Sequence, residues 1–141
     1  METPSSKLSL ILYSGTVDKL MAASILASGG VAMDMEVELF ITFWGLEAFR
    51  KGAHQTNTTI SKEFEAFGPA MMAVMQEKQV PTWMDNLRQA KELGNLHVVA
   101  CSHTMEMFDI KLEDLEDIVD EVVGVASFLA SAEDAKVTLF I

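Results

Sequence analysis

The feature that most constrains this chain is its alternation of short apolar runs with longer segments of helical spacing. The strand-like runs are Lys7–Tyr13, Val37–Thr42, Leu96–Ala100, Lys136–Ile141 and the weaker Val119–Val123. Between them lie segments with helical patterns, over Val17–Ala32, Phe64–Met75, Trp83–Leu93 and Gly124–Ala132. Strands that alternate with helices in this way indicate β-α-β units and a parallel sheet.

About five strands in a chain of 141 residues predict one α/β domain of the flavodoxin-like, doubly wound kind. We expect three layers, with a mostly parallel five-stranded sheet between helices. No repeat, low-complexity tract or linker divides residues 1–141. The remaining segments predict short helices over Trp44–Lys51 and after a cap at Ser102 or Thr104, a loop over His54–Ser61 and a helical turn over Leu112–Asp117.

The composition excludes several classes of partner. The formal net charge is −11 and no run of Lys or Arg occurs, so we expect binding neither to nucleic acid nor to an anionic membrane. The polar segment Met1–Lys7 does not resemble a secretion signal, and a single cysteine cannot form a disulfide within the chain. Both observations favour a cytoplasmic location. Hydrophobic residues make up 50% of the chain, which favours a homo-oligomer.

Ligands of parallel sheets bind beyond the carboxyl ends of the strands. Three predicted turns emerge there, at Tyr13–Thr16, Thr42–Gly45 and Cys101–Thr104. In the first turn, Ser14, Gly15 and Thr16 could offer backbone N–H groups to a small anion, although a tight turn with a helix cap is the simpler interpretation. In the second turn, Trp44 either walls a pocket or packs in the core.

Cys101 is the leading candidate for chemistry. A thiol at a strand end, just before a helix N-terminus, is favoured as the thiolate, and a protonated His103 would add to this effect. The alternative is a small buried hydrophobic residue at the end of an apolar strand. With one cysteine the chain has no resolving partner, so a dithiol cycle within it is excluded, whereas carrying sulfur needs one thiol.

Two other interpretations of these residues stay open. The run Cys101-x-His103-x-Met105-x-Met107 offers soft ligands suited to Cu(I). Residues two apart diverge on a helix, however, so a helix starting near His103 predicts no metal site. No nucleotide or zinc motif indicates a cofactor. Alternatively, the chain is a non-catalytic binding or assembly protein, with Cys101 in the core and the Met-rich segment 64–84 at an interface.

Segments along nearly the whole chain resemble the DsrE/DsrF-like family of sulfur-relay proteins. They are YSGTVDKLMA from Tyr13, FITFWGL from Phe40, GPAMMAVM from Gly68, VVAC ending at Cys101, GVASFL from Gly124 and TLFI ending at Ile141. The resemblance implies a parallel α/β fold, a homo-oligomer (commonly a trimer), sulfur passed through Cys101, and rhodanese-like and TusA-like partners. The chain departs from the pattern at Ser102–Thr104 and at Asp109.

We therefore predict a cytoplasmic sulfur carrier or sulfurtransferase-like protein without a cofactor. Cys101 is its nucleophile and carries either a persulfide or a thiosulfonate group. Its neighbours Ser102, His103 and Thr104 hold the thiolate and any anionic group on it. A pocket is expected to form around them from Ser14, Gly15, Thr16 and Trp44.

Overall fold

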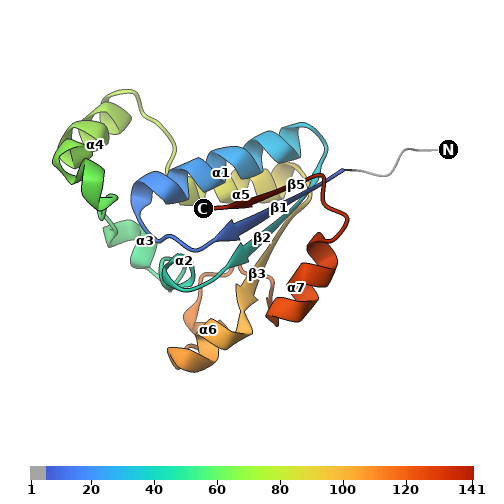
Figure 1. The fold of residues 1–141 in the computed structure, drawn as a ribbon. Coiled ribbons are helices and arrows are strands. Elements are labelled where there is room, and N and C mark those ends of the chain that lie inside the picture. The colour runs from blue at the N-terminus through green and yellow to red at the C-terminus, as the bar shows by residue number, and fades with distance from the viewer. Residues whose placement is uncertain (1–5) are drawn as a thin grey trace.

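The sheet is five-stranded and entirely parallel. The computed structural model describes residues 6–141. The first five residues of Met1–Lys7, the segment that does not resemble a secretion signal, lie outside this range. The strand order is β4-β3-β2-β1-β5 (Figure 1). The strands are β1 (Lys7–Leu12), β2 (Glu36–Ile41), β3 (Leu96–Cys101), β4 (Glu121–Val123) and β5 (Val137–Phe140). Helices lie on both faces, which confirms the predicted three-layer α/β arrangement.

The order of the strands determines which face each helix covers. From β1 through β2 to β3 the chain advances in one direction, and right-handed crossovers place α1 (Val17–Ala32) and α5 (Trp83–Leu93) on the same face. From β4 the chain returns across the sheet to β5, so α7 (Val125–Ala132) covers the opposite face. We call these the α1 face and the α7 face.

The α1 face carries the main hydrophobic core. Leu10, Leu39 and Val98 are side by side in the strand register and fully buried. Gly30 brings α1 close to the sheet, because a Cβ there would press on the side chains of Leu8 and Val37. This close packing fixes α1 above β1 and β2.

The α7 face is polar at the amino ends of the strands and apolar at their carboxyl ends. Near their amino ends it is polar, where Lys7 donates to the backbone oxygen of Ser131 (2.6 Å) and the Ser131 hydroxyl donates to Glu38 (2.9 Å). Near their carboxyl ends it is apolar, and Phe128 of α7 stacks on Phe40 of β2 with ring centroids 4.4 Å apart. Cys101 belongs to this apolar part, because Val99, two residues before it, pairs with Phe40.

Shorter elements connect these layers. They are α2 (Trp44–Glu47), α3 (Ala53–Thr56), η1 (Lys62–Phe67), α4 (Gly68–Glu77), α6 (Ser102–Met107) and η2 (Leu112–Asp114). Two predictions were wrong here. The segment predicted as a loop from His54 contains most of α3, which starts after Gly52 turns the chain with φ 80°. The N-cap of α6 is Cys101 itself, so neither Ser102 nor Thr104 caps that helix.

No helix of residues 6–141 combines the length and the apolar character that crossing a membrane requires.

Candidate functional site

The three predicted turns meet at one edge of the sheet, because β1, β2 and β3 are parallel neighbours. The Thr42 N–H donates to the Leu12 carbonyl (3.0 Å), and the Gly45 N–H donates to that of Tyr13 (2.9 Å). Glycine is required at this junction. A Cβ at Gly45 would collide with the Leu12 carbonyl, and one at Gly15 would collide with the Trp44 carbonyl.

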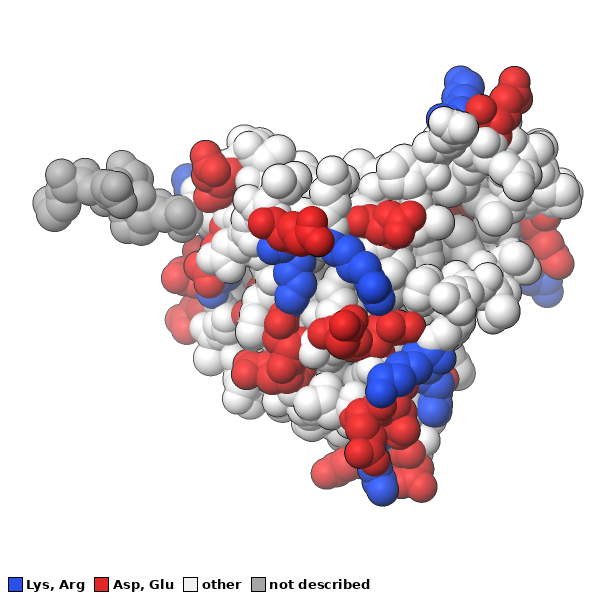
Figure 2. All heavy atoms as spheres, turned by 180° about the vertical axis from the view of Figure 1, so that it is seen from behind, with Lys and Arg blue, Asp and Glu red and all other residues white. Residues whose placement is uncertain are grey.

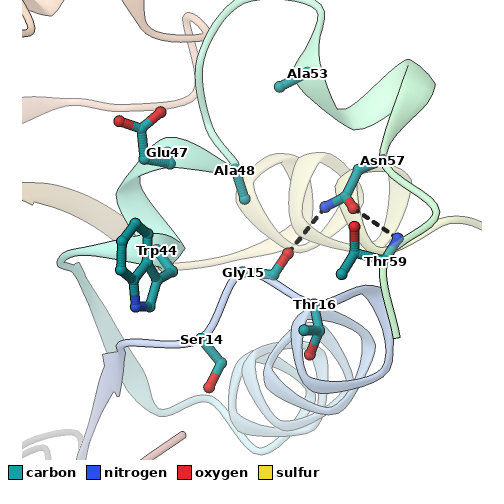
Figure 3. Close-up of a pocket in the computed structure, with 9 residues that line it drawn as sticks. All are labelled: Ser14, Gly15, Thr16, Trp44, Glu47, Ala48, Ala53, Asn57 and Thr59. Atoms are coloured by element: carbon teal, nitrogen blue, oxygen red, sulfur yellow. Dashed lines mark hydrogen bonds between the residues drawn. The ribbon is translucent and has the colours of Figure 1, made fainter. Parts of the chain in front are cut away.

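The candidate site residues divide between two pockets. The rim pocket, of about 450 Å³, is lined by Ser14, Gly15, Thr16, Trp44, Glu47, Ala48, Ala53, Asn57 and Thr59 (Figure 3). The thiol pocket, of about 390 Å³, is lined by Ile11, Phe40, Thr42, Phe43, Cys101, His103, Thr104, Val125, Phe128, Leu129 and Phe140. Of the predicted residues, only His103 and Thr104 share the pocket of Cys101. Ser102 lines neither pocket.

Phe43 and Trp44 separate the two pockets. Phe43 has φ 51° and ψ −120°, a backbone conformation that side-chain-bearing residues adopt only at a cost of about 1–3 kcal/mol. This bend turns the Phe43 ring into the thiol pocket and leaves Trp44 in the rim pocket. The Phe43 ring packs against Tyr13, Trp44 and Phe108, with centroid distances of 5.7–6.0 Å. Tertiary packing thus maintains the strained bend.

Cys101 lies at the floor of the thiol pocket. It is the last residue of β3 and only 5% exposed. Most of the side chains around it are apolar, and three of them, Val125, Leu129 and Phe140, are more than half exposed and surround the opening. A reagent reaching the sulfur therefore leaves water and enters a mainly hydrocarbon surrounding.

Two threonines supply the polar contacts near the thiol. Thr104 is fully buried, and its Oγ1 accepts the Phe43 N–H (3.2 Å) and lies 3.0 Å from the Thr42 Oγ1. Either hydroxyl can donate to the other, and the one that accepts keeps its own hydrogen free to point to Cys101. Thr42 lies at the end of a predicted strand, but threonine is too common at strand ends for the sequence to single out this residue as part of the site.

These contacts decide the ionisation of the thiol. Burial alone raises the pKa of Cys101, but hydrogen bonding from Thr104, Thr42 and the His103 N–H outweighs it, so the pKa lies below its ordinary value. Thiolate is the nucleophilic form of cysteine. The site therefore presents a thiol of lowered pKa inside an apolar pocket.

The soft-ligand run does not form a common site. Helix α6 begins at Ser102, one residue before the predicted start near His103, and it buries Met105 while leaving Met107 48% exposed. Within residues 6–141, no group of three or more His, Cys, Asp or Glu side chains gathers to hold a metal ion.

The rim pocket is built by a loop fastened to the start of α1. Asn57 donates to the Gly15 carbonyl (2.9 Å) (Figure 3). The Val17 N–H donates to the Thr59 carbonyl (2.8 Å). The Ser61 N–H donates to Asp18 (3.1 Å). Burial raises the pKa of Asp18, but hydrogen bonds from Ser61 and Thr16 outweigh it, so that pKa is lowered. A carboxylate in the first turn opposes the anion binding predicted for Ser14–Thr16.

Comparison with known proteins shows the family of this chain. The model of the DsrE/DsrF/DrsH-like family matches residues 4–71 and 54–140, and the chain belongs to that family. The family resemblance read from the sequence is thereby confirmed.

Two relatives match along nearly their whole length. The uncharacterized protein YrkE of Bacillus subtilis (strain 168) is 34% identical, with all of both chains covered. The sulfur carrier protein DsrE2 of Allochromatium vinosum is 28% identical, with 96% of this chain and 98% of that protein covered. Among solved structures, MTH1491 of Methanobacterium thermoautotrophicum, a protein of unknown function, superposes with a TM-score of 0.62 at 12% identity, covering 97% of this chain and 100% of its own. That likeness concerns the fold.

Proposed function

We propose that this protein carries sulfane sulfur on Cys101, taking it from a donor persulfide and passing it to an acceptor thiol. The observation that carries the proposal is the Cys101 thiol, with its lowered pKa, at the floor of an apolar pocket. Membership of the DsrE/DsrF/DrsH-like family and the similarity to a protein named as a sulfur carrier support it.

The transfer needs no external oxidant or reductant. The Cys101 thiolate attacks the terminal sulfur of a donor R–S–SH, so that a new S–S bond forms at Cys101 and the donor's S–S bond breaks. The donor leaves as R–S⁻ and the terminal proton stays on the transferred sulfur. In the second step an acceptor thiolate attacks that terminal sulfur, and Cys101 leaves as the thiolate. The threonine hydroxyls stabilise this thiolate at the start and at the end.

The lining of the pocket favours neutral sulfur as the cargo over the thiosulfonate alternative. A thiosulfonate carries a fixed negative charge whose desolvation requires a cation or several hydrogen-bond donors. The residues that line the thiol pocket include no Lys or Arg, and His103 is their one basic side chain. A persulfide adds one polarisable sulfur atom and is neutral when its terminal sulfur is protonated, a form that an apolar pocket favours, whereas a thiosulfonate stays ionised.

The donor and acceptor in this proposal are proteins. The exposed apolar side chains of Val125, Leu129 and Phe140 at the opening suit contact with a protein surface. The family resemblance names rhodanese-like and TusA-like proteins for these roles. We propose the cytoplasm as the location, where thiols stay reduced.

A loading experiment tests this proposal. Wild type and Cys101→Ser are incubated with polysulfide, and separately with thiosulfate and tetrathionate, and their intact masses are measured under native conditions. We expect polysulfide to add sulfur atoms to wild type alone. A polysulfide adduct on both proteins would remove Cys101 from the mechanism. A thiosulfonate adduct alone would reverse the assignment of the cargo.

A further inference from the structure

The segment of η1 and α4, residues 62–77, stands away from the body of the protein, and we call it the arm. Figure 1 shows it beyond the end of the sheet, where α4 packs mainly on η1. Its apolar side chains face solvent, with Phe64 55%, Phe67 67% and Val74 48% exposed. A helix of ten residues is marginal in water by itself and depends on packing for its stability. The arm thus presents an apolar surface that residues 6–141 cover only in small part.

A pocket of about 290 Å³ opens where the arm meets the start of α1. Asp18 contributes its one polar side chain, and the rest of the lining is apolar: Ile60, Phe64, Phe67, Gly68 and Met71. Pockets that hold drug-sized ligands measure about 300–1,000 Å³, so this one suits a single side chain or a short alkyl chain. Its lining favours an occupant that is apolar along most of its length and polar at one end.

Asp18 is a half-buried carboxylate without a cationic neighbour. Its Oδ1 accepts the Ser61 N–H (3.1 Å), and hydrogen bonds from Ser61 and Thr16 keep its pKa below the ordinary value, so it is ionised at neutral pH. No Lys, Arg or His side chain of residues 6–141 forms an ion pair with it. A carboxylate beside apolar side chains attracts a cation more strongly than one in open water, because less water screens it.

A lysine or arginine side chain of another protein matches both parts of this pocket. Such a side chain packs its methylene stem along apolar surface while its charged head reaches a carboxylate. The exposed rings of Phe64 and Phe67 add a cation–π attraction, which is strongest where water is excluded. A neutral side chain would leave the Asp18 carboxylate without a partner, and an acidic one would be repelled by it.

The charge of the whole molecule favours a basic partner. The net charge is −11, and Figure 2 shows acidic side chains over much of the molecule while the arm is largely white. The sequence from Ala66 to Gln76 is uncharged, and the arm lysines Lys62 and Lys78 each follow or precede an acidic neighbour, Glu63 and Glu77. This field attracts a basic protein at a distance and repels both an anionic membrane and a second copy of the chain.

We propose that the arm and Asp18 form a docking site for a basic partner protein, which inserts a lysine or arginine side chain into this pocket and packs an apolar face on α4. The head of the inserted side chain pairs with the Asp18 carboxylate, and its stem lies against Phe67 and Met71. Docking also supplies the packing that α4 depends on. This site does not rest on the sulfur-carrying role of Cys101.

A cationic helical peptide probes the site. The probe is a labelled peptide of alanine, leucine and lysine, with lysine and leucine on the same face of the helix, and the full chain is titrated into it while fluorescence anisotropy is measured. A second peptide has glutamine in place of every lysine. We expect the lysine peptide to bind and the glutamine peptide to bind at least about tenfold more weakly. Added salt should weaken binding of the lysine peptide, because it screens the charges.

Matched variants separate the pocket from the general negative field. Asp18→Asn removes the charge but keeps an oxygen that can accept the Ser61 N–H, and it should weaken binding of the lysine peptide about tenfold. Phe67→Ala removes one wall of the pocket, keeps the carboxylate and should also weaken binding. Glu65→Gln removes an equal charge from the arm at a residue that does not line the pocket, so binding should change less than about twofold.

Failure of the lysine peptide to bind, equal binding of the two peptides, or equal losses with Asp18→Asn and Glu65→Gln would overturn the proposal. An oligomer of wild type that dissociates in Phe67→Ala would assign the arm to a second copy and overturn it as well. Binding to phosphatidylcholine vesicles that is lost in Phe67→Ala would assign the arm to a lipid surface, with the same consequence. If Asp18→Asn does not fold, the two peptides and Phe67→Ala, whose side chain is largely exposed, still decide the outcome.

Discussion

Thr104 is the residue whose role can be measured most cleanly. Replacing it with valine removes the hydroxyl that stabilises the Cys101 thiolate, so the pKa of Cys101 should rise. We expect alkylation by iodoacetamide at pH 7 to slow at least several-fold, and its pH profile to move to higher pH. The substitution also leaves the Phe43 N–H unpaired, at a cost of about 1–3 kcal/mol in unfolding free energy.

Ser102→Ala is the matched control, since Ser102 lines neither pocket. If Thr104→Val and Ser102→Ala have the same alkylation profile as wild type, hydrogen bonding from Thr104 does not set the ionisation of the thiol.

The sequence could place Cys101 at the end of a strand, with His103 and Thr104 near it, because that position depends on one apolar run. It could not single out Thr42 or Phe43. The contact between Thr42 and Thr104 joins residues 62 positions apart, and the positive φ of Phe43 depends on packing against three other rings. The same limit explains why Trp44, expected beside Cys101, lines the other pocket.

Among the elements, α7 contributes Val125, Phe128 and Leu129 to the lining of the thiol pocket. Phe128 is 2% exposed and anchors α7 on Phe40, so Phe128→Ala should lower the unfolding free energy by about 3–5 kcal/mol. It should also speed the reaction of Cys101 with iodoacetamide in the folded protein. Urea unfolding and alkylation below the unfolding transition measure the two effects.

Leu129→Ala, at a position 57% exposed on the same helix, should change stability far less. Equal stability losses for the two variants would show that α7 is not anchored through Phe128.

The Thr82 cap predicted for helix α5 can be tested by substitution. Thr82 caps it, accepting the Asp85 N–H (3.1 Å) while the Asp85 carboxylate accepts the Thr82 N–H (3.2 Å). Thr82→Ala should cost about 1 kcal/mol and lower the melting temperature by a few degrees. Thr58→Ala, at an exposed position, serves as the control. A melting temperature unaffected by Thr82→Ala would mean that the cap contributes nothing.

Local patterns predicted such elements well. The bounds predicted for α1 and α5 agree with the structure, because apolar spacing and, at α5, the Thr82 cap are short-range signals. The order of the strands could not be predicted from the sequence, because β5 pairs with β1 and the paired residues lie about 130 positions apart in the chain. The predicted loop from His54 missed α3 for a related reason, as that short helix has no apolar stripe of its own and buries no residue.

At the scale of the whole molecule, the net charge of −11 and the apolar lining of the thiol pocket should both disfavour the approach of an anion to Cys101. Iodoacetate, an anion, should alkylate Cys101 much more slowly than neutral iodoacetamide, by a larger ratio than for a free thiol such as glutathione. Added salt should narrow that difference, because it screens the field of the protein. A ratio no greater than that of glutathione would mean that the site admits anions readily, and would favour a thiosulfonate cargo.

A single-turnover transfer measurement tests directly whether Cys101 carries sulfur from a donor to an acceptor. The protein is loaded with polysulfide, freed of excess donor and mixed with an acceptor thiol protein, and the intact masses of both are followed over time. We expect this chain to lose one sulfur atom at the rate at which the acceptor gains one, and Cys101→Ser to transfer none. A loaded protein that keeps its sulfur, or releases it only as free sulfide, would contradict the claim that Cys101 is a carrier.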